Sequence, residues 1–336
     1  MSVEKTFRAA VAAHRGGDLR SAEYGYRAAL AEAPDLVVGL DNLANILAAQ
    51  GRLAELVEVH QRLLEIRPSD ELHTVLGTTL LILGRYQEGW AHYEHRPQRR
   101  SGAPKTKVPE WQGEPLAGKN LVIWQEQGFG DQIQMARYAP LLDAQTIQFA
   151  CLPPLTRLLD QVCATAPRLG GVTGRFDYWV SSMSLPLRFA TTVETVPAPA
   201  RFSAKPRLSG GVGVVARGSP HHANDANRSL PEEQAAQLLR LPNAMSLAPE
   251  DTGAADFLET AEIVAGLDVV VCVDTAIAHL AASLGKPVFL LLSSAMPDWR
   301  WMRQRTDSPW YDSVRIFRQP EPGNWAAVIE AVRAEL

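Results

Sequence analysis

Apolar positions in the first hundred residues repeat with a helical period, and the helical segments themselves recur along the chain. Gly17, Gly51 and Gly84 lie 34 and 33 residues apart, and each precedes an amphipathic run. The runs read SAEYGYRAALAEAP, AELVEVHQRLLEIRP and QEGWAHYEHRP. Each repeat is therefore predicted to be a helix, a glycine turn, a second helix and a proline stop, so that residues 1–100 form stacked helical hairpins.

These repeats resemble the tetratricopeptide repeat over residues 3–96. The period agrees, and the small residues Ala10 and Ala44 recur in register, although the third copy departs at Thr78. The resemblance implies a concave surface that binds a protein or peptide. An array this short is equally consistent with a structural brace for the segments that follow.

The pattern changes after the repeats. Residues 97–118 are rich in proline, glycine and charge and are interpreted as a linker. An apolar strand is predicted at 119–125, followed by the glycine turn EQGFG, a helix over 131–144 and another strand at 146–152. This order is typical of a βαβ unit.

A second alternation of strands and helices begins with the apolar run at 211–217. Further buried strands are predicted at 269–273 and 288–292, with helices between them. We therefore expect an α + α/β chain whose second part has two Rossmann-like halves and binds its ligand where the strands end. The expected boundaries are 1–100 for the hairpins, 101–204 and 205–316 for the two halves, and 317–336 for a C-terminal crossover helix.

Composition excludes several classes of function. The net charge of -4 and the pI of about 6.1 provide no general attraction to nucleic acid. Cys151, Cys163 and Cys272 have no CxxC spacing, so neither a disulfide framework nor a zinc site is expected. The N-terminal run lacks the apolar core of a signal peptide, and no apolar stretch is long enough to span a membrane. We expect a cytoplasmic protein.

The strongest local signal is LDVVVCVDTAIAHLAASLGKPVFLLL (267–292), a buried strand followed directly by a helix. The free N–H groups at such a helix start favour an anion, and the small Ala276 lets a diphosphate approach the backbone. His279 would add a hydrogen-bond donor. The alternative is that Asp274 and Thr275 only cap the helix and that His279 packs in a polar pocket.

This segment resembles the donor-binding motif of GT-B glycosyltransferases of the heptosyltransferase and bacterial TPR-linked type, distant relatives of the O-GlcNAc transferases. WQEQGFGDQIQMARYAPLL, PHHANDANRSLP and PDWRWMRQRTDSPWY resemble further blocks of these enzymes, in the same order. The resemblance implies a GT-B fold, a nucleotide-sugar as co-substrate with no other cofactor, and a protein acceptor such as flagellin or another surface protein. It also implies inversion at the sugar.

Residue roles follow from the same resemblance. Asp131 matches the Gly-Asp catalytic base of these enzymes. Glu126 is a rival candidate for the base. The alternative for Asp131 is a purely structural role as the N-cap of the helix. Gly128 and Gly130 are counted among the donor-binding positions.

Arg228 stands where related enzymes place a cation on the donor phosphates, and its planar fork suits that task. Asn224 and Ser219 are candidate helpers, although such residues often only form turns. No Asp-Xaa-Asp triplet is present and His221-His222 lacks a third ligand, so no metal is expected.

Two other classes of function remain open at this point. One is a non-catalytic adaptor that retains a nucleotide-sugar pocket, and the other is a sugar-nucleotide epimerase of the same fold. Asp131, Arg228 and His279 together favour the transferase over the adaptor. An epimerase has no need of a protein-binding array.

Overall fold

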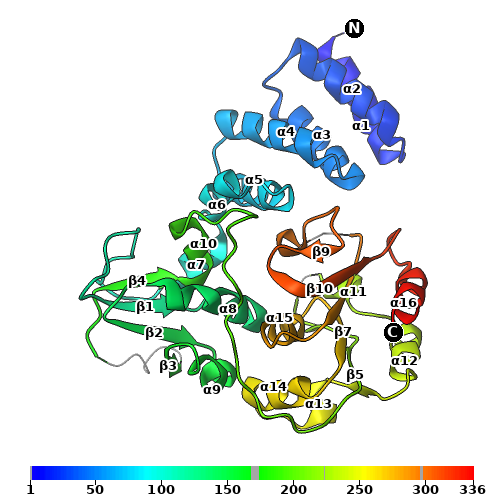
Figure 1. The fold of residues 1–336 in the computed structure, drawn as a ribbon. Helices are drawn as coiled ribbons and strands as arrows, with labels where there is room; N and C mark the ends of the chain where they lie inside the picture. Colours follow the sequence, from blue (N-terminus) through cyan, green and yellow to red (C-terminus); the bar gives the residue numbers. More distant parts are fainter. Residues whose placement is uncertain (1, 168–173, 223, 296–297) are drawn as a thin grey trace. The chain divides into compact units, whose positions relative to one another are not determined.

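The computed structural model of the chain describes residues 2–167, 174–222, 224–295 and 298–336 (Figure 1). It divides into two compact units, Met1–Pro97 and Gln98–Leu336. None of the helices within these described ranges is long and apolar enough to cross a membrane.

The first unit consists of the predicted helical hairpins. Its helices are α1 (Val3–Arg15), α2 (Leu19–Glu32), α3 (Val37–Gln50), α4 (Leu53–Ile66), α5 (Asp70–Ile82) and α6 (Tyr86–Tyr93). Gly17, Gly51 and Gly84 have φ values of 82°, 68° and 79°, the left-handed conformation that glycine adopts without strain. A Cβ on Gly25 would lie 2.7 Å from the Cβ of Ala10, so paired helices here need small residues. The hairpin prediction is confirmed.

The second unit begins with a parallel four-stranded sheet. Its strands are β1 (Asn120–Trp124), β2 (Thr146–Cys151), β3 (Ala164–Pro167) and β4 (Tyr178–Ser181), in the order β3-β2-β1-β4. Short helices connect or follow these strands: α8 (Phe129–Met135), α9 (Thr156–Leu159) and α10 (Leu185–Arg188). The expected strands at 119–125 and 146–152 are present, and β1 lies between β2 and β4, where the direction of the strand order reverses.

The predicted linker at 97–118 is more ordered than its composition indicates. It contains α7 (Pro97–Gly102), and its far end joins the edge of the first sheet. Glu110 pairs with Trp179 of β4, and the Trp111 amide donates to the Trp179 carbonyl at 2.7 Å. Because Trp111 is also buried, this part of the segment belongs to the fold of the first half.

The helix expected over 131–144 begins and ends earlier. α8 starts at Phe129, because Gly128 provides an extended N-cap, and it stops at Met135. A 3-10 helix, η1 (Ala136–Leu141), continues the chain and contains Pro140, which has no N–H to extend an α-helical ladder. Asp131 is therefore the third residue of the helix, and the interpretation of Asp131 as the N-cap is wrong.

A six-stranded sheet forms the second half. Its strands are β5 (Val212–Val215), β6 (Ala244–Ser246), β7 (Val269–Val273), β8 (Val288–Leu292), β9 (Asp307–Ser308) and β10 (Tyr311–Arg318), in the order β6-β5-β7-β8-β10-β9. The pairs are parallel except β9 with β10, which are antiparallel at one edge. Its helices are α11 (Asp225–Arg228), α12 (Glu232–Leu239), α13 (Pro249–Thr252), α14 (Phe257–Ala265), α15 (Ala276–Ser283) and α16 (Trp325–Arg333).

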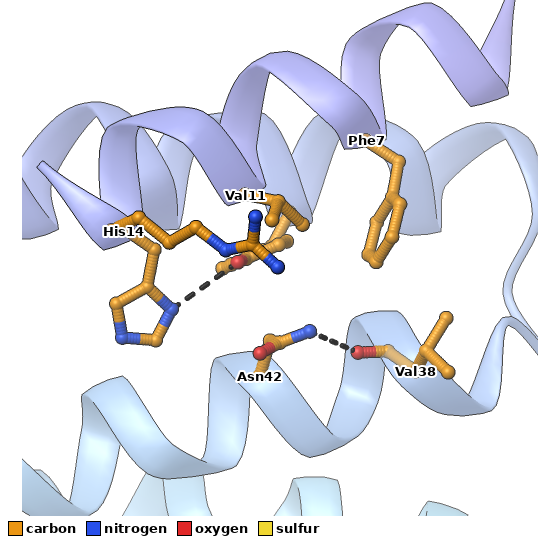
Figure 2. A pocket seen from close by; sticks show the side chains of 7 residues that line it. Phe7, Val11, His14, Val38 and Asn42 are labelled. Carbon is orange, nitrogen blue, oxygen red and sulfur yellow. Dashed lines mark hydrogen bonds between the residues drawn. The ribbon is translucent and has the colours of Figure 1, made fainter.

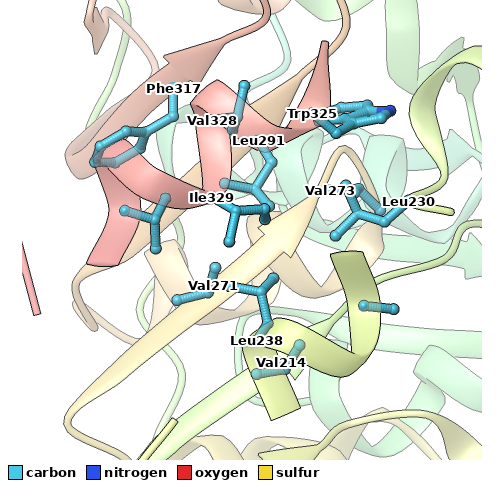
Figure 3. Close-up of a cluster of buried hydrophobic side chains, with 12 residues drawn as sticks. Val214, Leu230, Leu238, Val271, Val273, Leu291, Phe317, Trp325, Val328 and Ile329 are labelled. Carbon is cyan, nitrogen blue, oxygen red and sulfur yellow. The ribbon is translucent and has the colours of Figure 1, made fainter. Parts of the chain in front are cut away.

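The core of the second half lies where α12 and α16 cover one face of this sheet (Figure 3). Val271 and Val273 of β7 contribute to that cluster, and α15 packs on the opposite side of the sheet (Figure 1). Trp325 is buried in the cluster, which places α16 in the second half. The two Rossmann-like halves expected for a GT-B fold are thus both present.

Candidate functional site

Two loops that follow buried parallel strands meet at the candidate site. One follows β1 and enters α8, and the other follows β7 and enters α15. Both strands lie beside the position where the strand order of their sheet reverses, the usual place for a ligand in an open α/β sheet. A Cβ on Gly130 would lie 2.7 Å from His279 Cδ2 and 3.2 Å from the Ala276 Cα, so the first turn of α8 rests directly on α15.

Asp131 is held from two sides. Its Oδ2 accepts the Gly128 N–H at 2.8 Å, which closes the first turn of α8. Its Oδ1 accepts a hydrogen bond from Arg300 Nη2, which comes from the other half of the unit. Burial raises the pKa of Asp131, and the positive charge of Arg300 opposes that rise.

Arg300 itself is rigidly placed in the 3-10 helix η4 (Trp299–Trp301). Its Nε donates to Gln134 Oε1 at 2.7 Å, and its Nη1 contacts both carboxylate oxygens of Asp298 at 3.0 and 3.2 Å. The guanidinium also stacks over the ring of Trp299 at 4.2 Å. These contacts leave the side chain only 6% exposed.

The start of α15 carries an unsatisfied hydroxyl. Thr275 is the N-cap residue, but its side chain makes no capping hydrogen bond, and within the described part of the chain its buried Oγ1 has no partner. Arg228 is nearby, because its Nη1 donates to the Asp274 carbonyl at 2.9 Å while its Nε pairs with Asp225 at 3.1 Å. Ala276, the first residue of α15, adds no bulk beyond a methyl group.

Burial, together with the neighbouring carboxylate of Asp298, raises the pKa of Asp274 to about 7. This carboxyl group therefore changes its charge near neutral pH. An ionised Asp274 would repel a diphosphate at the helix start, whereas the protonated form could donate a hydrogen bond to it.

His279 lies in the interior and is only 4% exposed. Its Nδ1 shares a hydrogen bond with the Tyr311 hydroxyl at 3.0 Å, and its ring stacks on Trp301. Burial and the nearby Arg300 and Arg137 lower its pKa well below the ordinary value, so the ring is neutral. Its Cδ2–Nε2 edge lies beside Gly130.

The remaining predicted residues lie around this centre. Glu126 is buried at the end of β1, where it accepts a hydrogen bond from the Ser181 hydroxyl at the end of β4. Asn224 uses its side-chain oxygen to accept a bond from Asn227 at 2.7 Å. Ser219 is exposed, and its carbonyl accepts the His222 N–H in a turn. Glu126 therefore forms a buried polar pair with Ser181, whereas the contacts of Asn224 and Ser219 are those of local turns.

Two buried arginines, Arg300 and Arg137, were not among the site residues predicted from the sequence. Arg137 donates through Nη1 to the carbonyls of Pro197 and Trp310, both at 3.0 Å, and lies over the rings of Trp310 and Tyr311. Trp310 and Tyr311 are buried with it and pack against its guanidinium. The sequence feature that could have indicated Arg300 is a cation flanked by two aromatic residues, Trp299 and Trp301. In the described ranges, no three His, Cys, Asp or Glu side chains are arranged to hold a metal ion.

The helical unit carries its own hollow of about 480 Å³, lined mainly by α1 and α3. Figure 2 shows Phe7 and Val11 of α1 facing Val38 and Asn42 of α3, with apolar groups prevailing. Val38 is 49% exposed, so the surface offers apolar contact to another molecule.

Residues 218–326 match the sequence model of glycosyltransferase family 9 (heptosyltransferase). We call residues 218–326 the family 9 segment. The family 9 segment contains Ser219, Asn224, Arg228, the 274–276 helix start and His279, whereas Asp131 and Glu126 lie outside it.

The chain is also similar to the protein FlbA of Caulobacter vibrioides, with 27% identity over 324 residues that cover 77% of this chain and 54% of that protein. The chain thus spans about half the length of this curated relative.

Among solved structures, the iron-containing dodecameric glycosyltransferase TibC of enterotoxigenic E. coli matches with 14% identity and a TM-score of 0.45, covering 63% of this chain and 66% of that one. The family 9 glycosyltransferase of Veillonella parvula matches with 8% identity and a TM-score of 0.44, covering 66% and 91%. Another structure of TibC contains ADP-D-beta-D-heptose.

Proposed function

We propose that the chain is a glycosyltransferase that transfers a sugar from a nucleotide-sugar, with a nucleotide-activated heptose as the first donor to test. The family 9 segment supports the activity, and one observation supports the donor position. The Thr275 hydroxyl is buried and has no partner in the described residues, at the N-terminus of an eight-residue helix. A buried hydroxyl without a partner is unfavourable, so a phosphate oxygen at this position would satisfy both the hydroxyl and the free N–H groups.

Charge supports the same position. Arg228 already contacts the Asp274 carbonyl, so its guanidinium lies within reach of a diphosphate at α15. The departing nucleotide gains negative charge during transfer, and a fixed cation with helix N–H groups would stabilise it without a metal. We therefore propose a metal-independent transfer.

Asp131 is the proposed base for the acceptor hydroxyl. Its carboxylate is adjacent to Gly130, which rests on the start of α15, so a base and the donor position lie side by side. Glu126 is less suitable, because it is buried against Ser181 at the end of β4. A direct displacement by the activated hydroxyl would invert the configuration at the sugar.

The test measures donor binding and donor turnover on the full chain with ADP-heptose and with UDP-, GDP-, dTDP- and CMP-sugars. A donor at 100 times its dissociation constant should stabilise the fold by about 2.7 kcal/mol. Thr275→Val should leave the ligand-free protein as stable or more stable, since it removes an unpaired hydroxyl, yet it should weaken donor binding. Arg228→Ala should weaken binding, Arg228→Lys should recover part of it, and Arg240→Ala is a remote control.

Two results would contradict this proposal. If Thr275→Val destabilises the free protein and leaves donor affinity unchanged, the hydroxyl is structural. If a donor binds but is turned over by neither water nor any acceptor, the chain is an adaptor. Turnover that survives treatment with EDTA is expected for a metal-independent reaction.

The acceptor is proposed to be a protein or peptide that binds the hollow between α1 and α3. A Val38→Glu variant should lose transfer to that acceptor while it retains donor binding. Tyr24→Glu is the matched control, because Tyr24 is 79% exposed and does not line the hollow. Equal transfer by both variants would instead favour the brace.

A further inference from the structure

The side chain that faces the proposed base comes from the opposite half of the α/β unit. Asp131 belongs to α8, and Arg300 follows it by 169 positions, in η4. We propose that Arg300 is a positioning residue for the reaction, which holds the Asp131 carboxylate as an anion in one orientation toward the acceptor hydroxyl. This inference rests on the proposed function of Asp131.

The geometry of Arg300 suits this role. Gln134 accepts from Nε at 2.7 Å, Asp298 accepts from Nη1, and Trp299 covers the planar face at 4.2 Å. Asp298 also accepts the Arg300 backbone N–H at 2.8 Å, which fixes the turn itself. With these contacts formed, the guanidinium presents Nη2 to Asp131 from a fixed position, and little reorganisation is needed when the base acts.

The carboxylate retains capacity for the acceptor. Its two oxygens offer about four lone-pair positions. The Gly128 N–H and Arg300 Nη2 use one position on each oxygen, so a third hydrogen bond from a sugar or protein hydroxyl can still form. A base that is fixed by two donors and still open to a third can orient an incoming hydroxyl.

Among the charged groups described around Asp131, Arg300 is the cation that lowers the pKa of Asp131. Asp298 lies on the same segment as Arg300 and contributes a negative charge. His222, from the loop after β5, is exposed, and partial desolvation and the charge of Arg228 lower its pKa. His279 of α15 is neutral beside Gly130. Arg300 therefore supplies the positive charge that opposes the effect of burial on Asp131.

The experiment follows the titration of Asp131 directly. The full chain is labelled with aspartate carrying ¹³C in the carboxyl group, and the Asp131 signal is assigned with Asp131→Asn. Arg300→Met should raise the pKa of Asp131 by about 1–3, the usual effect of removing an opposite charge at this distance. Arg300→Lys retains the charge, should keep the pKa closer to that of the wild type, and provides a folded variant if Arg300→Met is unstable.

The matched control is Arg157→Gln. Arg157 also joins the two halves, through Asp256 at 2.8 Å, but it is 55% exposed and has no contact with Asp131 among those described. Its removal should leave the Asp131 titration unchanged. An unmoved titration in Arg300→Met, or an equal movement in Arg157→Gln, would overturn the proposal.

Donor turnover distinguishes this inference from the proposed function. If Arg300 acts through the base, the acidic limb of kcat/KM for donor turnover should move to higher pH in Arg300→Met by the same amount as the Asp131 titration, with donor affinity retained. A loss of activity that is equal at every pH, together with weakened donor binding, would assign Arg300 to the donor phosphates and overturn it. If the wild type turns over no nucleotide-sugar, the proposed function fails, while the titration still decides whether Arg300 controls the charge of Asp131.

Discussion

Gly130 offers the most direct test of how the two halves meet. It is the second residue of α8, and Gly130→Ala would add a single methyl group toward α15. That methyl would lie 2.7 Å from His279 Cδ2, 3.3 Å from His279 Nε2 and 3.2 Å from the Ala276 Cα. The first distance is far shorter than carbon–carbon contacts at optimal separation, which are about 3.5–4.0 Å.

Moving either His279 or the Ala276 backbone away from this methyl group would cost free energy. His279 is held by Tyr311 and stacked on Trp301, and the Ala276 Cα belongs to the helix backbone. Overpacking of this kind costs about 1–3 kcal/mol. Replacing glycine by alanine within a helix stabilises the helix by about 0.5–1 kcal/mol. The net loss of unfolding free energy should therefore be about 1 kcal/mol, or a Tm lower by about 2–4 °C for a unit of this size.

Thermal unfolding of Gly130→Ala beside Gly102→Ala measures this cost. Gly102 ends α7, and an added Cβ there meets no atom within 4 Å, so the control changes the same chemical group without a clash. We expect the control to be neutral or slightly stabilising. A Gly130→Ala protein as stable as the wild type would show that the first turn of α8 does not rest on α15 in solution.

Two further predictions concern pH. Asp274 has a folded-state pKa of about 7, above the ordinary value near 3.8, so its ionisation disfavours the fold, and its contribution to stability falls as the pH rises from about 4 to 7. If the donor diphosphate binds at α15, its affinity should also weaken between pH 6 and 8, and calorimetry should find this dependence reduced in Asp274→Asn. In the helical unit, His73 and His92 bond through their Nδ1 atoms at 2.7 Å, and burial lowers the pKa of both. Because the unfolded chain then binds protons more readily, stability is complete above about pH 6.5 and is lost as the pH falls. Thermal unfolding from pH 7.5 to 5.5 should show this loss, and His92→Gln should reduce it. A dependence unchanged by the substitution would assign it to other groups.

The features that could be predicted from the sequence are those that depend on residues close together along the chain. The glycine turns at Gly17, Gly51 and Gly84 need only a left-handed residue between two amphipathic runs. The strand β7 is apolar throughout and buried throughout. The placement of candidate residues on the loops after β1 and β7 also needed only the local pattern, because a ligand is expected where parallel strands end.

Pairings across long stretches of sequence were not predictable from one chain. Asp131 carries a local signal in QGFGD, but nothing near it indicates that its partner is Arg300. The contact with Arg300 changes the effect on stability that is expected when Asp131 is replaced. If Asp131 only capped the helix, Asp131→Asn would keep near-native stability, because asparagine caps a helix about as well as aspartate. Both carboxylate oxygens accept hydrogen bonds here, so an asparagine would turn an N–H group toward a donor and should cost stability.

The same contacts explain why a glycine is suited to position 130. If the donor diphosphate binds at the start of α15, the base must reach that point from the other half of the unit. Asp131 directly follows the residue that rests on Ala276, so the size of residue 130 sets how closely the base approaches the donor position. Any side chain at 130 would press on the backbone of α15 and move the carboxylate away from it. Gly130 would then contribute to transfer through its lack of a side chain, and donor turnover in Gly130→Ala should fall by more than its loss of stability explains.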